Sequence, residues 1–246
     1  MESVQLYDDG VRSWVFFGRD AGRPGEVIDT NEYLVTHQGR GLLLDPGGPE
    51  IFPPVVAALS REILLEDIEA VFGSHQDPDI ISSIPLWNTL CQGVKAYVPQ
   101  IWAGFLAHFA VDVDIVPIPD EGMTIPLGGS SDLRLVPAHY VHSSASYSLY
   151  DERAKILFSG DVGAALLPEG SPPFVEDFDA HVGYMEGFHR RWLPSNEAKN
   201  VWVERVRQLD VELMCPQHGA IFRRHDVPRF LDWLEGLEVA AALPRA

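Results

Sequence analysis

The first half of the chain alternates short apolar runs with glycine and proline, a pattern typical of β-strands separated by tight turns. Val, Leu, Phe and Tyr fill these runs. The strands are expected at residues 13–18, 32–38, 41–47, 68–75 and 94–99. Elsewhere apolar residues recur about every three to four positions, which predicts helices. These helices are expected at residues 55–63, 80–90 and 101–110, and Pro85 enters or disturbs the second of them.

The second half returns to strands before it becomes helical. Strands are expected at residues 114–119, 133–139, 146–151, 155–161 and 211–219, and the third and fourth of these form a hairpin. Helices are expected at residues 181–193, 195–209 and 226–237. Ser195 and Asp226 are predicted to be N-caps of the last two helices, and Glu197 lies in a first turn, where a carboxylate is favourable.

This order of elements predicts an α/β fold in which two sheets pack together with helices outside, a four-layer αββα sandwich. A doubly wound sheet would require a more regular alternation of strand and helix. Neither GxGxxG nor a Walker lysine follows the early strands, so nucleotide binding has no local support. We expect one domain over residues 1–246, without an internal repeat or a low-complexity linker.

Composition narrows the classes of partner. The 246 residues are 46% hydrophobic and 22% charged, and the formal net charge is −18. Such an acidic surface should repel nucleic acid and anionic membranes. No apolar stretch is long enough to span a bilayer, and the N-terminus does not resemble a signal peptide. The cysteines, Cys91 and Cys215, are far apart and form no CxxC pair, which fits a reducing cytoplasm and disfavours a zinc knuckle.

Four loops that follow predicted strands carry side chains able to bind a metal. Within Ser74–Asp79 a loop can turn alternate residues toward one point. Each of the other three loops also has an ordinary interpretation as a turn or a satisfied histidine, but all four in this order favour a metal centre. The six candidate ligands are His75, Asp77, Asp79, His142, Asp161 and His218.

The order His-x-Asp-x-Asp, then His, then Asp, then His resembles the ligand order of the metallo-β-lactamase superfamily, and LLLDPGG at residues 42–48 is similar to its early Asp turn. The resemblance covers nearly the whole chain and implies that Asp45 orients the metal loop. Most zinc hydrolases of the superfamily have histidines at the positions of Asp77 and Ile80, whereas flavodiiron proteins place a carboxylate at the first. The stretches AHYVHSSASYSLYD, KILFSGDVGA, GFHRRWLPSN and CPQHG resemble the oxygen-binding di-iron proteins. These oxygen-binding proteins are similar to the di-iron core of a flavodiiron protein without its flavodoxin domain. A chain that ends at Ala246 is expected to leave no room for such a domain.

The resemblance also implies how the ligands divide between two metals. His75, Asp77 and His142 would hold one metal, Asp79 and His218 the other, and Asp161 would bridge them. Ile80 cannot replace the histidine found in many relatives, which leaves the second metal with fewer protein ligands. Four further residues are candidates for an extra ligand or a hydrogen-bond donor at the site: His139, His189, Tyr140 and Tyr184. For the histidines, a structural role is the alternative.

Imidazole and carboxylate ligands without a thiolate suit iron, although zinc and manganese also fit. The first hypothesis is a non-haem di-iron protein that binds or reduces dioxygen, as a sensor, a carrier or a partner-dependent oxidoreductase. The chain contains no flavin or iron–sulfur motif, so reduction would require a separate redox protein, and sensing a signalling protein. The alternative is a dinuclear metal hydrolase acting on a thioester, phosphoester or lactone. A scaffold with a degraded site is a third hypothesis, and a homodimer would be unsurprising.

Overall fold

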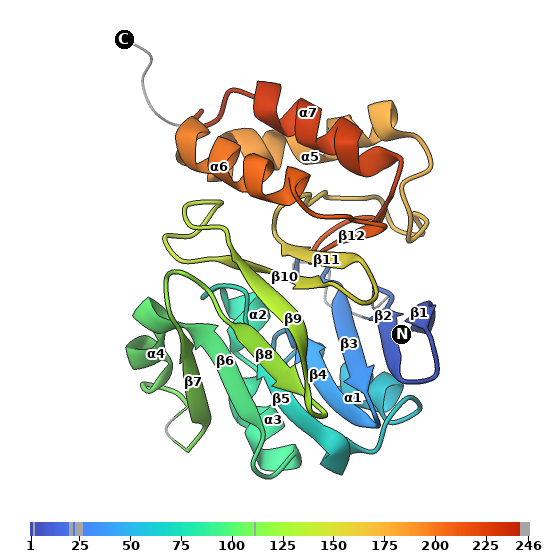
Figure 1. The fold of residues 1–246 in the computed structure, drawn as a ribbon, viewed down its shortest axis with the longest axis vertical. Helices are drawn as coiled ribbons and strands as arrows, with labels where there is room; N and C mark the ends of the chain where they lie inside the picture. The colour runs from blue at the N-terminus through green and yellow to red at the C-terminus, as the bar shows by residue number, and fades with distance from the viewer. Residues whose placement is uncertain (2, 20–21, 23–26, 111, 242–246) are drawn as a thin grey trace. The chain divides into compact units, whose positions relative to one another are not determined.

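The computed structural model describes residues 1, 3–19, 22, 27–110 and 112–241. The chain divides into two compact units, Met1–Leu133 and Arg134–Ala246. Each unit is described by itself below, with element labels as in Figure 1. The expectation of one domain over residues 1–246 remains a prediction.

The first unit is built on a seven-stranded sheet with the strand order β1-β2-β3-β4-β5-β6-β7 (Figure 1). Its strands are β1 (Ser3–Asp8), β2 (Arg12–Phe17), β3 (Glu32–His37), β4 (Arg40–Leu44), β5 (Ile68–Phe72), β6 (Lys95–Pro99) and β7 (Asp114–Ile118). Strands β1 to β4 pair antiparallel, and β4 to β7 pair parallel. Strands β4 and β5 are almost continuously apolar and buried, as parallel strands covered on both faces are.

Short helices connect the parallel strands of the first unit. They are α1 (Phe52–Leu59), the 3-10 turn η1 (Leu65–Asp67), α2 (Pro78–Ile81), α3 (Ile84–Leu90) and α4 (Gln100–Leu106). One apolar core joins them to the sheet, with Leu43, Val71 and Trp87 fully buried in it. The predicted helix at 80–90 is therefore two helices interrupted at Ser82–Ser83, and Pro85 lies in the first turn of the second, where its missing N–H costs no hydrogen bond.

A second sheet has six strands in the order β13-β12-β11-β10-β9-β8. Its strands are β8 (Thr124–Leu127), β9 (Ser130–Pro137), β10 (Tyr147–Asp151), β11 (Ile156–Gly160), β12 (Leu213–Pro216) and β13 (Phe222–Arg223). Strands β10 and β11 form the predicted hairpin, in which the Asp151 carboxylate accepts the N–H groups of Arg153 and Ala154. Strand β12 pairs parallel with β11 although residues 161–212 lie between them.

The second unit contains three longer helices, α5 (Phe178–Trp192), α6 (Asn196–Arg207) and α7 (Asp226–Gly236), which Figure 1 shows gathered together. As predicted, Ser195 caps α6, because its hydroxyl accepts the Ala198 N–H at 3.1 Å. The buried Lys199 ammonium donates to three carbonyls at the end of α7, Leu234, Glu235 and Leu237.

The expected α/β class is confirmed, and most predicted elements are present. The predicted N-cap of α7 is wrong: His225 is the capping residue, and Asp226 is the first helical residue, buried with its carboxylate 3.4 Å from the His225 ring. Strands β1, β8 and β13 were not predicted, since they are short or only partly buried and lack a strong apolar pattern. Among the described residues, no helix combines the length and apolar character needed to cross a membrane.

Candidate metal centre

The first group of candidate ligands leaves the carboxyl end of the parallel pair β4 and β5. The two strands are held in register just beyond β4, where the Asp45 N–H donates to the Phe72 carbonyl at 2.8 Å. Asp45 therefore directly follows β4, and Ser74 and His75 follow β5 at the same edge of the sheet. Strand pairing, rather than closeness in sequence, brings the early Asp turn beside the metal loop.

Asp45 fixes the orientation of His75 through Ser74. One carboxylate oxygen of Asp45 accepts the Ser74 N–H at 2.7 Å, and the other accepts the Ser74 hydroxyl, also at 2.7 Å. The Ser74 hydroxyl lies 3.0 Å from His75 Nδ1. All three residues are buried. Because this contact occupies Nδ1, the imidazole presents Nε2 as its ligand atom, the arrangement by which proteins usually orient a metal-binding histidine.

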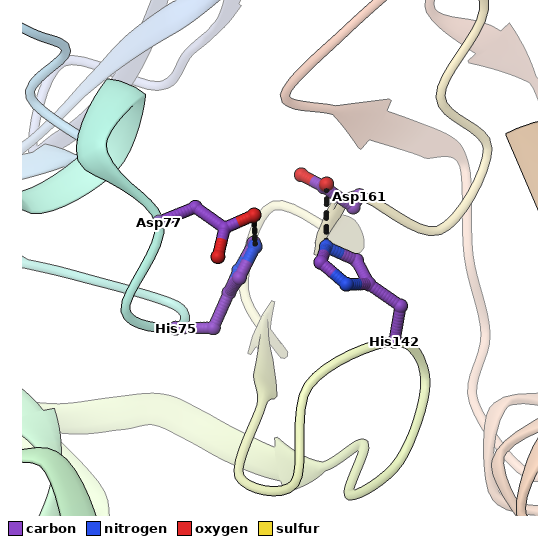
Figure 2. Close-up of side chains that lie close together, drawn as sticks. All are labelled: His75, Asp77, His142 and Asp161. Atoms are coloured by element: carbon purple, nitrogen blue, oxygen red, sulfur yellow. Dashed lines mark hydrogen bonds and ion pairs between the residues drawn. The ribbon is translucent and has the colours of Figure 1, made fainter. Parts of the chain in front are cut away.

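Asp77 and Asp79 lie at the start of α2. The Nε2 of His75 lies 3.5 Å from Asp77 Oδ2, a pair that Figure 2 shows with a dashed line. Asp77 is the N-cap residue of α2 but makes no side-chain cap, so its carboxylate is directed toward His75 instead. Asp79 is half-buried in the first turn of the helix. Ile80 is fully buried in the apolar core, so a ligand at this position would have to leave the core.

The second group of candidate ligands belongs to the second unit and follows another parallel pair. Strands β11 and β12 end side by side, with Gly160 opposite Pro216, and the Gln217 N–H donates to the Gly160 carbonyl at 2.8 Å. Asp161 follows β11, and His218 lies two residues beyond β12. The same edge of this sheet therefore presents a carboxylate and an imidazole, with His218 Nε2 3.7 Å from Asp161 Oδ1.

His142 reaches Asp161 from the tight loop between β9 and β10. The Ala138 N–H donates to the Ser146 carbonyl at 2.8 Å, and the Val141 N–H donates to the Ala138 carbonyl at 3.0 Å. The loop holds the His142 Nε2 2.9 Å from Asp161 Oδ2, the second dashed pair in Figure 2. Both side chains are 7% exposed.

Asp161 is thus the centre of the second group, because each of its carboxylate oxygens faces a different imidazole. Oδ2 lies against His142 and Oδ1 against His218. This divergence of the two oxygens is the geometry that a carboxylate needs to bridge two cations. A carboxylate so buried requires hydrogen-bond donors or a cation to offset its lost hydration.

His189 lies fully buried on α5, and both of its ring nitrogens bind backbone groups. Nδ1 lies 2.8 Å from the Met185 carbonyl, and Nε2 accepts the Gly163 N–H at 3.0 Å. Because both ring nitrogens contact backbone groups, neither is left for a metal, and a ligand role does not fit. Burial lowers the pKa of His189 to about 4, so the ring is neutral at physiological pH.

The remaining candidates lie around the same loops. The His139 ring contacts the edge of Tyr147 at a centroid distance of 5.1 Å. Tyr140 and Tyr184 are 54% and 44% exposed. A role for these three residues at the metal centre remains a prediction.

Phe188, which was not among the candidates from the sequence, lies beside His142 together with Trp192. Their rings lie 5.8 and 5.5 Å from the His142 ring, and they stack on each other. Their spacing of four residues on a helix is the only sequence signal that pairs them.

The donor set fits a metal that prefers nitrogen and oxygen. The candidates offer imidazoles and carboxylates. Burial raises the pKa of the Cys91 thiol to about 11 and also raises that of the buried Cys215, so neither cysteine supplies a thiolate at neutral pH. Such a set suits iron and manganese and is accepted by zinc.

Comparisons with known proteins extend over nearly the whole chain. The family model described as ODP family beta lactamase matches residues 28–219. The apo state of the chemotaxis sensor ODP from T. denticola is 43% identical, with a TM-score of 0.87, and the match covers 97% of this chain and 95% of that one. A structure described as a peroxy diiron species of chemotaxis sensor ODP is 42% identical, with a TM-score of 0.86, over 97% of this chain and 96% of that one.

More distant similarities agree in fold. A flavo di-iron protein mutant from Thermotoga maritima is 21% identical with a TM-score of 0.79, over 95% of this chain and 61% of that one. Among curated proteins, an uncharacterized protein of Methanocaldococcus jannaschii is 24% identical over 207 residues, which are 79% of this chain and 49% of that protein. The chain thus spans about half the length of the curated relative that it matches.

Proposed function

Because this chain belongs to the ODP beta-lactamase family, we propose that it is a non-haem di-iron protein that binds dioxygen and acts as an oxygen sensor. The resemblance to the di-iron branch of the metallo-β-lactamase superfamily is confirmed by the family match. The α/β fold with mixed sheets flanked by helices is shared with structures that are similar over 97% of the chain.

The observation that carries the proposal is the position of Asp161. Its two buried oxygens face two imidazoles, at 2.9 and 3.7 Å. A mononuclear site would need only one of these oxygens, whereas a pair of irons needs a carboxylate that reaches both. This geometry favours a dinuclear centre.

We propose that the candidate ligands divide between two irons as the family's ligand order implies. His75, Asp77 and His142 would hold one iron, Asp79 and His218 the other, with Asp161 between them. When bound, the iron pair supplies open coordination positions and reducing equivalents for dioxygen. Asp45 and Ser74 keep the His75 ring in one orientation. Ile80 is buried in the apolar core and offers no ligand atom, so it would add no ligand to the second iron.

Sensing fits better than catalytic turnover. Reduction of dioxygen consumes electrons, which a separate redox protein would have to deliver. Two structures above 40% identity are described as those of a chemotaxis sensor. We therefore propose a signalling protein as the partner. A cytoplasmic location and a homodimer remain parts of the proposal.

Metal analysis and an optical spectrum of anaerobically purified protein test the proposal, with the spectrum repeated after the addition of air. We expect about two irons per chain and a new, persistent visible band on exposure to oxygen. Rapid decay of the band together with consumption of reductant would replace the sensor by a reductase. Zinc without a spectral response would overturn the oxygen-binding function.

A further inference from the structure

The buried histidine of α5 holds a loop that carries a proposed ligand. A carbonyl oxygen only accepts hydrogen bonds, so the contact of His189 Nδ1 with the Met185 carbonyl places the ring proton on Nδ1. Nε2 is then an acceptor, and it takes the Gly163 N–H at 3.0 Å. The two hydrogen bonds are mutually consistent in one neutral tautomer. The ring therefore joins the helix backbone to the loop backbone.

Gly163 lies two residues beyond Asp161, in a turn with few alternatives. Its φ is +97°, and a Cβ atom would approach Met214 and Phe222 at 3.1 Å. The Ala164 N–H also donates to the Asp161 carbonyl at 3.0 Å. A shift of Gly163 would therefore be transmitted directly to Asp161.

The same helix contacts a second proposed ligand. Phe188 precedes His189, and its ring lies edge-on to His142 at 5.8 Å, while Trp192 contacts His142 from the next turn. Phe230 and Trp233 pack against the His189 ring itself, at centroid distances of 6.1 and 5.4 Å. The last turns of α5 thus restrain both the His142 ring and the Asp161 loop.

We propose that His189 is a positioning residue, which holds the Asp161 carboxylate between His142 and His218 by fastening Gly163 to α5. This inference rests on the proposed di-iron function, because it assumes that Asp161 is a ligand. His189 itself does not touch the metals. Without its acceptor, the Gly163 N–H would lose its partner, and the turn could rotate Asp161 away from one imidazole.

Two substitutions of His189 allow its two hydrogen bonds to be tested separately. The amide of asparagine occupies the place of Nδ1 and can donate to Met185, but it cannot reach Gly163. The longer amide of glutamine reaches the place of Nε2 and can accept the Gly163 N–H. The comparison of His189→Asn with His189→Gln therefore tests the bond to Gly163 with two polar side chains.

The chain offers a matched control in His181. This histidine is also buried on α5, contacts the Tyr184 and Phe222 rings, and has a pKa that burial lowers to about 4. No described contact joins it to the Asp161 turn. His181→Asn should therefore lower stability as a buried histidine change does, without changing metal binding.

The experiment titrates metal-free protein with Co²⁺, measures the number and affinity of bound ions by equilibrium dialysis, and records the visible cobalt bands. Thermal unfolding of each metal-free variant is measured in parallel. We expect His189→Asn to weaken binding by about 10- to 100-fold, the usual effect of losing a residue that orients a ligand, and to alter the bands. His189→Gln should stay within a few-fold of the wild type, and His181→Asn should bind as the wild type does.

The possible failures are distinguishable. If the wild type binds two cobalt ions and folded His189→Asn binds them equally well, the positioning role is wrong and the di-iron site stands. Equal losses in His189→Asn and His181→Asn would likewise reduce His189 to a general structural residue. A wild type that binds no pair of ions would instead overturn the proposed function.

Discussion

The two units contain the same local arrangement of a parallel strand pair followed by an aspartate and a histidine, but the aspartate has a different role in each. In each, an aspartate follows one strand and a histidine follows its parallel neighbour: Asp45 and His75 after β4 and β5, and Asp161 and His218 after β11 and β12. A backbone hydrogen bond of 2.8 Å closes each pair beyond the strand ends. Since the two strand arrangements match, the difference between the two carboxylates arises from the residues next to them.

The two carboxylates differ in the groups that contact their oxygens. Both oxygens of Asp45 accept short hydrogen bonds from Ser74, so Asp45 is satisfied and acts through that residue. Both oxygens of Asp161 face imidazole nitrogens instead. Ser74 thus makes Asp45 a group that orients a ligand, whereas Asp161 faces imidazoles and is the candidate ligand.

The largest effect should come from Asp161→Asn, which keeps the shape of the side chain but removes its charge and one acceptor. A neutral amide cannot bridge two cations, so we expect metal affinity to fall by more than about 100-fold and the second ion to be lost. Equilibrium dialysis with Fe²⁺ under anaerobic conditions measures this. Two tightly bound ions in this variant would show that Asp161 is not the bridge.

Asp45→Asn should have the next largest effect. Asparagine has one acceptor oxygen, so one of the two Ser74 donors would meet an amide N–H. We expect a loss of about 1–3 kcal/mol in the free energy of unfolding of the metal-free protein and about 10- to 100-fold weaker iron binding. Chemical denaturation and dialysis measure the two effects. An unchanged affinity would remove Asp45 from the orientation of His75.

Ser74→Ala tests the same link between Asp45 and His75 with a smaller change. The backbone N–H of residue 74 can still donate to Asp45, and only the hydroxyl contacts with Asp45 and His75 are lost. We expect a cost of about 1 kcal/mol in stability and up to about 10-fold in iron affinity, smaller than for Asp45→Asn. If the two variants reverse this order, the hydroxyl rather than the carboxylate controls the His75 ring.

The smallest effect on metal binding, none at neutral pH, is expected for His181→Asn, which instead changes the pH dependence of stability. Burial lowers the pKa of His181 to about 4, below its ordinary value of about 6.5. Its contribution to stability is therefore fully present above pH 6.5 and is lost as the pH falls through 4. Unfolding free energies of wild type and variant should differ in slope by up to about 1.4 kcal/mol per pH unit in this window. Parallel curves would contradict the lowered pKa.

Much of the fold could be predicted because the apolar runs are long enough to show whether their spacing is that of a strand or of a helix. Strands β2 to β7 and helices α5 to α7 follow directly from those runs. The N-cap of α7 could not be predicted, because Asp226 is a common capping residue that here pairs with His225 in the first turn. The weak strands β1 and β13 gain their structure from a neighbouring strand rather than from their own pattern.

The candidate metal ligands could be predicted from the sequence, because histidine and aspartate side chains are the residue types that bind such metals. The ligand candidates lie in loops that follow strands, in an order that a known family shares. The role of His189 was not accessible, because it depends on a hydrogen bond between residues 163 and 189, which no spacing rule connects. The contact of His142 with Phe188 and Trp192 was hidden for the same reason.

The parallel pairing of β11 and β12 also affects the order of assembly. Residues 161–212, including α5 and α6, must be placed before β12 can dock, whereas only residues 45–67 separate β4 from β5. Contacts that close long loops form slowly, because chain entropy must be lost first. A growing chain would thus complete the His75 group before it acquires His218. Because Asp161 and His218 meet only after β12 has docked, the second group of ligands would be the later one to form.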